Sequence, residues 1–367
     1  MELIATMRKL PEVLPEYRFS QHVESTLAEY CRFLESREDL LQLAQQYHNA
    51  IFEEKRYSLL EIEGLPELDG REQGLLFAVL FLARCQLLDR VLEAKGIPGR
   101  YKAGTVYTCV RQLEKNLEYY GTVGFQGMYR SRMISWLEPN QFILGRLTFQ
   151  ISTFGGPYRV YRNRENGALI PLALPDYLYL PDGKHAPAGY DGQSFSPELR
   201  EDAEGVLGYT FDENGLLIRD PVLLKRAEYE IVLQPGDDVV NVHIPPVGRL
   251  DAAAADDAFV QAEAFFKTYY PQKQFRAWVC SSWLLDTGLK EILKPTSNIL
   301  QFQSRFRIVL AGVNTFSLYW HIFDVQRALP LAELHPRNQF QETILERIKA
   351  GKNLYNGYGF ILWEGES

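Results

Sequence analysis

Cysteine is scarce in this sequence, and its four cysteines do not occur in pairs. Cys31, Cys85, Cys109 and Cys280 are far apart and form no CxxC motif, which favours reduced thiols in a cytoplasmic protein over a disulfide framework. None of the six histidines lies at metal-ligand spacing from another, so we expect no structural zinc site and no bound metal.

Long hydrophobic runs and a basic charge excess are also lacking. No run approaches the roughly 18 apolar residues that span a bilayer, and the N-terminal residues show no signal-peptide pattern, so we expect no membrane association. With 39 Lys and Arg against 47 Asp and Glu, the net charge is −8, which argues against nucleic acid as a partner. GxSxG and Walker motifs are absent, which excludes the enzyme classes that depend on them.

Helical periodicity dominates the first 140 residues. Apolar residues recur at helical spacing between 21 and 47, and the stretch 72–92 is dense in Leu, Ala and Phe, as in a buried central helix. A Gly- and Pro-containing break at 96–99 precedes a further helix predicted over 105–120. We therefore predict a helical N-terminal domain over residues 1–140, with no strand before about Gln141.

From Phe142 onward, apolar and polar residues alternate. The strings GRLTFQIS and PYRVYRN are typical of strands with one solvated face, and residues 208–218 are predicted to form another strand pair. The segment 181–204, rich in Gly, Pro, Asp and Ser, is predicted to be a long surface loop. The chain is thus predicted to be an α/β protein with its sheet confined to residues 141–367.

The clearest order of elements lies between residues 229 and 309. A β-rich run at 239–244 stops at two prolines, and a helix pattern over about 252–270 leads to an apolar strand at 275–280. This order predicts two adjacent parallel strands joined by a right-handed crossover, a unit that forms ligand clefts at its strand ends.

Several strings, ILGRLTFQ, VVNVHIPPVGRLD, AEAFFKTYYP, WVCSSWLLD and SNILQFQSRF, resemble a bacterial family of acyltransferase-domain proteins. In that family a helical N-terminal domain precedes a GNAT-like domain, named for the general control N-acetyltransferase superfamily, with a mixed sheet and crossover helices. The resemblance covers most of the chain and implies N-acyl transfer from acetyl-CoA or another acyl-CoA to a small-molecule or peptide amine. Because fold does not determine chemistry, the alternative is a non-catalytic GNAT-like module that binds a small ligand or a partner protein.

In a GNAT fold, the acyl-CoA lies where two central parallel strands splay apart. The resemblance implies that backbone groups at the end of the first strand contact the pantetheine arm. The following turn and helix N-terminus would face the pyrophosphate, and an asparagine that opens a later helix would lie near the sulfur. The implied cofactor-binding residues are Val242, Ile244, Gly248, Arg249 and Asn298.

Two departures from the family's pattern favour the non-catalytic alternative. The usual pyrophosphate loop contains two small residues after a Gln or Arg, whereas this chain has two prolines and only Gly248. The tyrosine that commonly acts as general acid, seven residues after the asparagine, is replaced by Arg305, which does not release a proton at neutral pH.

His243 and Ser281 are the candidate catalytic residues, because they lie at the ends of the two predicted parallel strands. His243 can act as a general base toward an amine, or it can be a packed or capped histidine. Ser281 and Ser282 can hydrogen-bond a substrate carbonyl or cap the following helix. Cys280 fits a buried apolar cysteine better than a nucleophile, and Arg146 can meet a phosphate or form a surface ion pair. The sequence gives no indication of the oligomeric state.

Overall fold

The computed structural model describes residues 2–54, 68–187, 189–245, 248–325 and 328–363. The chain divides into two compact units, Met1–Leu144 and Gly145–Ser367. Each unit has its own hydrophobic core.

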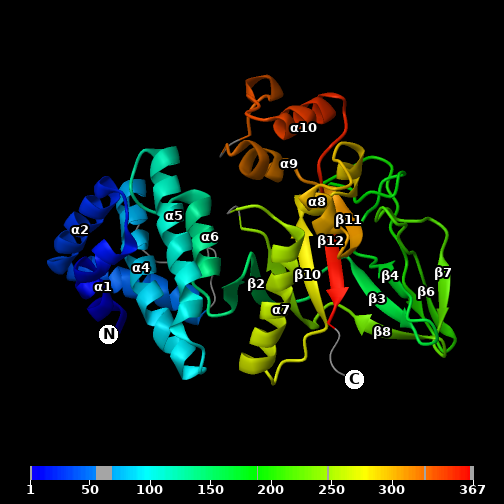
Figure 1. Cartoon of the computed structure of the whole chain (residues 1–367), viewed down its shortest axis with the longest axis horizontal. Helices are drawn as coiled ribbons and strands as arrows, with labels where there is room; N and C mark the ends of the chain where they lie inside the picture. Colours follow the sequence, from blue (N-terminus) through cyan, green and yellow to red (C-terminus); the bar gives the residue numbers. More distant parts are fainter. Residues whose placement is uncertain (1, 55–67, 188, 246–247, 326–327, 364–367) are drawn as a thin grey trace. The chain divides into compact units, whose positions relative to one another are not determined.

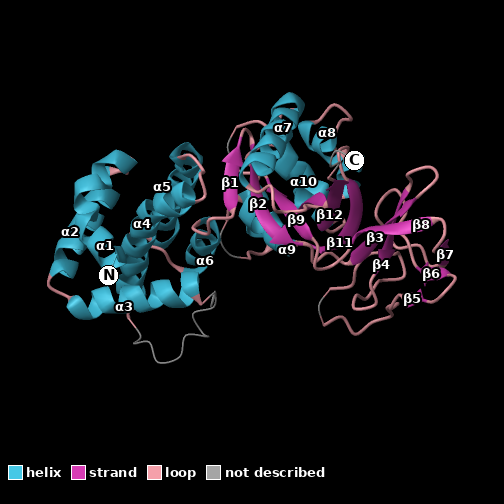
Figure 2. Ribbon diagram, turned by 90° about the horizontal axis from the view of Figure 1, so that it is seen from below, coloured by secondary structure: helices cyan, strands magenta, loops and turns pink. Residues whose placement is uncertain are grey.

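The first unit is built from helices (Figures 1 and 2). Up to residue 140 its described part contains no strand, which confirms the helical prediction for this half of the chain. The helices, with the shorter 3-10 and π turns, are α1 (Glu2–Val13), η1 (Leu14–Tyr17), α2 (Gln21–Glu35), α3 (Glu38–His48), η2 (Asn49–Glu53), α4 (Gly70–Ala94), η4 (Gly99–Lys102), α5 (Ala103–Tyr120) and α6 (Gly127–Trp136).

Helix α4 is the central helix of this unit, as its composition predicts. The Asp69 side chain begins it by accepting hydrogen bonds from the backbone N–H groups of Arg71 and Glu72, so two of the donors at the helix start are satisfied. Almost every residue from 74 to 88 is buried in the core shared with the other helices. Gly124 packs so closely on this helix that a Cβ atom there would lie 2.5 Å from the carbonyl carbon of Gly74.

A sheet organises the second unit, with its strands in the order β2-β9-β10-β12-β11; β1, formed by the last residues of the first unit, precedes β2 in the order of this six-stranded sheet. Strands β9 and β10 are parallel, whereas β2–β9, β10–β12 and β11–β12 are antiparallel pairs. The strands are β1 (Gln141–Leu144), β2 (Leu147–Thr153), β9 (Asp238–His243), β10 (Ala277–Ser282), β11 (Arg307–Val313) and β12 (Tyr355–Leu362).

Helix α7 (Ala252–Tyr269) connects the parallel strands β9 and β10, which confirms the predicted crossover. Its ring at Phe259 contacts Phe149 of β2 and Trp278 of β10, with centroids 5.7 and 5.4 Å away, so the helix covers one face of the sheet. Strand β10 begins at Ala277, two residues later than predicted, because a turn after Pro271 precedes it.

Two small sheets belong to the opposite face of the main sheet (Figures 1 and 2). Tyr158, Val160 and Leu233 from the first of them share a buried core with Val239 and Phe360 of the main sheet. Their strands are β3 (Tyr158–Asn163), β4 (Leu169–Ala173) and β8 (Tyr229–Leu233), followed by β5 (Arg200–Glu201), β6 (Gly205–Gly208) and β7 (Val222–Lys225).

The strand pair predicted over 208–218, with a turn at 212–215, forms only in part: the chain turns there and Phe211 bridges Leu217 in antiparallel fashion, but no regular strand forms. Residues 209–218 hold only isolated bridges such as Phe211 to Leu217, and β6 ends at Gly208. The Asp212 side chain accepts hydrogen bonds from the backbone of Asn214 and Leu216, which favours a tight turn over a regular ladder. The predicted loop over 181–204 is irregular apart from isolated bridges and the two residues of β5.

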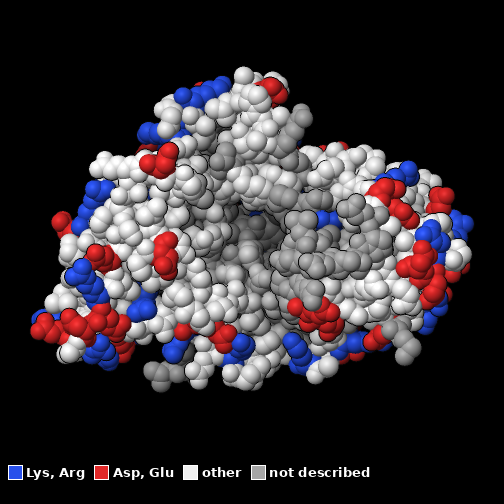
Figure 3. Space-filling model, turned by 180° about the vertical axis from the view of Figure 1, so that it is seen from behind, with Lys and Arg blue, Asp and Glu red and all other residues white. Residues whose placement is uncertain are grey.

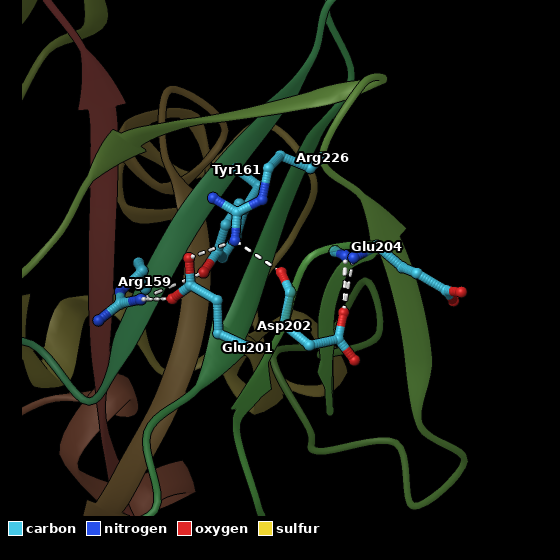
Figure 4. A network of polar contacts seen from close by, with 7 residues as sticks. Arg159, Tyr161, Glu201, Asp202, Glu204 and Arg226 are labelled. Atoms are coloured by element: carbon cyan, nitrogen blue, oxygen red, sulfur yellow. Dashed lines mark hydrogen bonds and ion pairs between the residues drawn. The ribbon is translucent and has the colours of Figure 1, made fainter.

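A polar network joins the two small sheets (Figure 4). One guanidinium nitrogen of Arg226 donates to the Glu201 carboxylate at 3.3 Å and to the Asp202 carbonyl at 2.7 Å. The other carboxylate oxygen of Glu201 lies 3.5 Å from Arg159 of β3. Glu201 therefore lies between two cations, and its contacts fix β5 beside β3.

A helical segment follows β11 and shares an apolar core with the elements after β10. These elements are η5 (Trp283–Leu285), η6 (Thr287–Glu291), α8 (Asn298–Gln303), α9 (Thr315–Ser317), η7 (Leu318–Phe323), η8 (Leu331–Glu333) and α10 (Gln339–Lys349). Within the described part of the chain, no helix has the length and apolarity needed to cross a membrane.

Candidate active site

The central strands β9 and β10 pair over only part of their length. Their ladder consists of two pairs, Trp278 with Val240 and Val279 with Asn241. On its other side each strand is paired along all six residues, with β2 and β12 respectively. The ends of the two strands, 242–243 and 280–282, therefore face each other without a ladder, and their inner backbone groups are available to a ligand.

The two faces of the sheet differ at this opening. Val242 lies opposite Phe149, whose ring contacts Phe259 of α7, so the Val242 side chain points to the helix-covered face. It is buried, which leaves its backbone as the part that a ligand can reach. By the alternation along a strand, His243 points to the opposite face.

His243 is held by a neighbour on β2. Its Nε2 atom lies 3.0 Å from the Oε1 atom of Gln150. With an amide oxygen as acceptor, the proton is on Nε2, and the lone pair of Nδ1 is free to accept a proton. The ring has solvent access, yet the surrounding atoms desolvate it and lower its pKa below 6.5, so the imidazole is neutral at pH 7.

Ser281 lies on the same face as His243. Val279 is paired with Asn241, and Ser281 is two residues further along β10, so its side chain shares the face of Asn241 and His243. Ser281 is exposed, and its hydroxyl makes no hydrogen bond to the described residues.

The neighbours of Ser281 have structural roles. The Ser282 hydroxyl accepts a hydrogen bond from the backbone of Leu284 at 3.1 Å, so it caps η5, in agreement with the capping interpretation. Cys280 is buried, and desolvation raises the pKa of its thiol to about 12. A thiol in this state is not a nucleophile at neutral pH, as expected.

The segment after β9 is fastened by Arg146, which follows the β1 strand. Its guanidinium donates to the backbone carbonyls of Pro245 at 3.0 Å, Gly248 at 3.2 Å and Arg249 at 2.8 Å. Arg146 therefore holds this segment in place through the backbone. Residues 246 and 247, part of the turn expected to face a pyrophosphate, lie outside the described residues.

Gly248 and Arg249 lie exposed just before α7. Gly248 has φ +64°, and no atom would lie within 4 Å of a Cβ built on it, so this stretch of backbone is open to solvent. The Arg249 side chain is 83 % exposed and lies 3.6 Å from Asp251.

The N-terminus of α7 is not capped by a side chain. Asp251 occupies the N-cap position, but its carboxylate does not accept from the first-turn N–H groups. One carboxylate oxygen instead lies 3.3 Å from the Asn298 amide nitrogen. The first turn of α7 thus keeps the N–H groups and the positive dipole end that bind anions.

Asn298 and Arg305 both connect α8 to α7. Asn298 reaches Asp251 as described, which brings it to the predicted pyrophosphate region. The Arg305 guanidinium contacts the Asp256 carboxylate at 2.6 Å and donates to the Ala252 carbonyl at 3.0 Å. Arg305 is thus a tether for the start of α7.

The sequence alone does not reveal the contact of Gln150 with His243 or the role of Arg146 in holding the segment after β9. Gln150 is one of three polar residues, with Thr148 and Ser152, that alternate with apolar residues along β2. That alternation marks a polar face, but only the antiparallel register places Gln150 next to His243. Within the described part of the chain, no group of three or more His, Cys, Asp or Glu residues is arranged to hold a metal ion.

A mixed sheet whose central parallel strands splay apart beside a crossover helix defines the GNAT-like fold class. The chain belongs to the family of the GNAT-like C-terminal domain, whose model matches residues 142–361. No curated protein matches the chain.

Solved structures of acyltransferases share this fold. One is an acyltransferase in complex with decanoyl-CoA and teicoplanin, and another is an acyltransferase mutant in complex with octanoyl-CoA. Each aligns with a TM-score of 0.61 and 17% identity, over 96% of this chain and 86% of the other. At this identity the likeness concerns the fold alone, and the aligned residues come from both units.

Proposed function

We propose that this protein is an acyl-CoA-dependent N-acyltransferase that moves an acyl group to an amine of a small molecule or peptide. The single observation that carries the proposal is the opening between β9 and β10, with the neutral imidazole of His243 on one of its faces. This arrangement offers both a channel for an amide-bearing donor and a base for the acceptor.

The features of the opening fit an acyl-CoA. Unpaired strand backbone suits the two amide groups of the pantetheine arm, and the α7 N-terminus suits its pyrophosphate. The exposed Gly248 allows a ligand to approach the backbone. The solved neighbours bind octanoyl-CoA and decanoyl-CoA, so we include medium-chain donors beside acetyl-CoA.

The proposed reaction is a direct acyl transfer. The acceptor nitrogen attacks the thioester carbonyl carbon, the C–N bond forms, and the C–S bond breaks to release the CoA thiolate. His243 takes the proton from the amine through Nδ1, and Gln150 holds its ring through Nε2. The Ser281 hydroxyl and a strand N–H near Ile244 are proposed to hydrogen-bond the carbonyl oxygen as negative charge develops.

The acceptor of the acyl group is proposed to be an amine of a small molecule or peptide. One solved neighbour is bound to teicoplanin, so a complex small molecule is compatible with the fold. The net charge of −8 favours a cationic amine over an anionic acceptor. Acidic and basic side chains are interspersed on the surface drawn in Figure 3.

A non-catalytic module is the second candidate, and specific observations favour it. Arg305 occupies the position of the usual general acid and is bound to Asp256, so it supplies no proton to the leaving thiolate. The Asp251 carboxylate at the start of α7 would repel a pyrophosphate. A protein with these features can retain the fold and bind a ligand without transferring its acyl group.

Two measurements separate these candidates. Calorimetry with CoA, acetyl-CoA and octanoyl-CoA tests binding, and release of the CoA thiol in the presence of an amine panel tests transfer. We expect binding, amine-dependent thiol release, and loss of release in His243→Gln with affinity retained. His22→Gln, an exposed histidine on α2, is the matched control and should leave both unchanged.

Each other outcome has a definite meaning. Binding without thiol release across the panel supports the non-catalytic module. Absence of binding at millimolar acyl-CoA excludes the acyl-CoA proposal altogether. Transfer that persists in His243→Gln excludes His243 as the base.

A further inference from the structure

A pocket lies at the opposite end of β10 from the candidate active site. It has a volume of about 440 Å³ and is lined by residues from β3, β8, the turn before β10 and the end of β12: Arg162, Val232, Lys273, Gln274, Phe275, Arg276, Leu362 and Trp363. In Figure 1 this is where the C-terminal end of β12 lies. The four residue steps from Arg276 to Cys280 separate it from the opening by about 13 Å, so it is not part of the proposed donor channel.

Among the described residues, three cations line the pocket and no carboxylate does. Of its three cations, Lys273 is paired with Asp238, at 2.8 and 3.0 Å from the two carboxylate oxygens. The side chains of Arg162 and Arg276 have no hydrogen bond or ion pair with any described residue. By contrast, the nearby Arg164 is bound to Glu230 at 2.7 Å. Two free guanidinium groups at one pocket favour an anionic ligand.

Apart from Gln274, the remaining lining residues are apolar, and the aromatic ones are held in place. Trp363 stacks on Trp278, with ring centroids 4.3 Å apart and planes at 27°, and its ring centroid lies 5.4 Å from that of Phe275. The Trp363 backbone N–H donates to the Arg276 carbonyl, and the Arg276 N–H donates to the Asp238 carbonyl. The aromatic wall and the turn that carries Arg276 are therefore fixed relative to each other before any ligand binds.

We infer that this pocket binds a small organic carboxylate with an aromatic or branched apolar body. The two guanidinium groups match a planar carboxylate, whereas Phe275, Leu362 and Trp363 match the apolar body. The volume is in the range of small-molecule sites, roughly 300–1,000 Å³.

A phosphate group suits the pocket less well. Phosphate sites usually present several free backbone N–H groups or a helix N-terminus. Here the N–H groups of Lys273 and Arg276 are bonded to the carbonyls of Tyr270 and Asp238, which leaves two N–H groups of the turn, those of Gln274 and Phe275, without a backbone partner among the described residues. The charge is thus delivered by side chains, which favours the carboxylate.

The test uses 2-naphthoate as the probe and 2-naphthamide as its neutral counterpart. Binding to the full chain is followed by calorimetry and by the change in tryptophan fluorescence. We expect 2-naphthoate to bind with a Kd below about 1 mM, and 2-naphthamide and inorganic phosphate to bind at least about 10-fold more weakly. Arg162→Gln and Arg276→Gln should each weaken 2-naphthoate by about 10-fold or more.

The matched control is Arg71→Gln, which removes the same charge at an exposed position of α4, outside the pocket lining. It should leave the affinity within about twofold. The inference is overturned if 2-naphthoate fails to bind at about 10 mM, or if the pocket variants bind it as well as the control. It is also overturned if octanoyl-CoA displaces the probe, because the ligand would then occupy the donor channel. None of these outcomes depends on acyl transfer.

Discussion

The Nε2 atom of His243 lies 3.0 Å from the side-chain oxygen of Gln150, across the antiparallel pair of β9 and β2. Through this contact a residue of β2 selects the tautomer in which Nδ1 is the basic atom. A substitution at Gln150 can therefore change the pKa of the imidazole without replacing His243 itself.

Replacing Gln150 by Glu should shift the pH dependence of acyl transfer. Desolvation lowers the pKa of His243 below 6.5, so the wild-type rate should fall only as the pH drops below about 6.5. A carboxylate at position 150 favours the imidazolium and should raise this apparent pKa by about 1 unit or more. The measurement is the pH profile of kcat/KM, with Ser152→Glu, on the same strand, as the control. An unchanged acid limb in Gln150→Glu would contradict the role of His243 as the base.

Two substitutions at Gly248 should distinguish an effect of backbone strain on stability from steric blocking of the donor. Gly248 has φ +64°, so Val should destabilise the segment by about 1–2 kcal/mol even without a ligand. Asn tolerates this conformation, and there is room for its Cβ. We expect Gly248→Asn to unfold like the wild type and yet to bind acetyl-CoA more weakly in calorimetry, because its side chain blocks the backbone. Equal acetyl-CoA affinity in Gly248→Asn and wild type would place the donor elsewhere.

Replacing Arg146 should weaken donor binding indirectly, through the position of the segment after β9. Arg146 donates to three carbonyls of the segment after β9, and substitution by Ala removes these three hydrogen bonds. We expect Arg146→Ala to lower the affinity for octanoyl-CoA by about 10-fold, or about 1.4 kcal/mol. Arg146→Lys should rescue little, because an ammonium group cannot reproduce the fork that spans three carbonyls. Full rescue by Lys would show that charge alone matters.

Asp286 should be a stability determinant of the second unit. Its buried carboxylate accepts from the backbone N–H groups of Gly288 at 2.9 Å and Tyr355 at 3.0 Å. Asn turns an NH₂ group toward one of these donors, so Asp286→Asn should lower the free energy of unfolding by about 1–3 kcal/mol in urea denaturation.

The pH dependence of this effect follows from the pKa of Asp286, which desolvation raises above its usual 3.8. The folded protein therefore binds the proton more tightly than the unfolded chain. The carboxyl's contribution to stability is largest at acid pH and falls as the pH rises through the folded-state pKa. The stability gap between wild type and Asp286→Asn should narrow over that interval, and a widening gap would contradict this linkage.

The β9–α7–β10 unit could be predicted from the sequence because each of its parts is encoded locally. Alternation marks the strand, two prolines end it, and Phe259 and Phe266 lie at the helical spacing that buries them on the sheet. The helical first unit was predicted for the same reason, since the stretch around α4 is apolar on nearly all sides.

The polar contacts of the site could not be predicted in this way. His243 and Gln150 are 93 residues apart, and Arg146 and Arg249 are 103 residues apart, so the strand register and the path of the segment after β9 bring them together. Arg146 has the same local sequence signal as any surface arginine. The strand pair predicted over 208–218 forms no regular ladder because the Asp212 side chain competes for backbone N–H groups, which alternation of apolar residues does not reveal.

The short ladder between β9 and β10 also has a consequence for the dynamics of the protein. Only two residue pairs join β9 and β10 in the middle of a six-stranded sheet, so we expect the backbone amides beside this short ladder to exchange with solvent water in the free protein. On the proposed function, the pantetheine arm fills the opening beside this ladder as an extra strand and completes the sheet. Saturation with the acyl-CoA donor should then slow amide exchange in both strand pairs, β2–β9 and β10–β12. The effect should include β2 and β12, which do not contact the donor, because the sheet can open between β9 and β10 only after the donor dissociates.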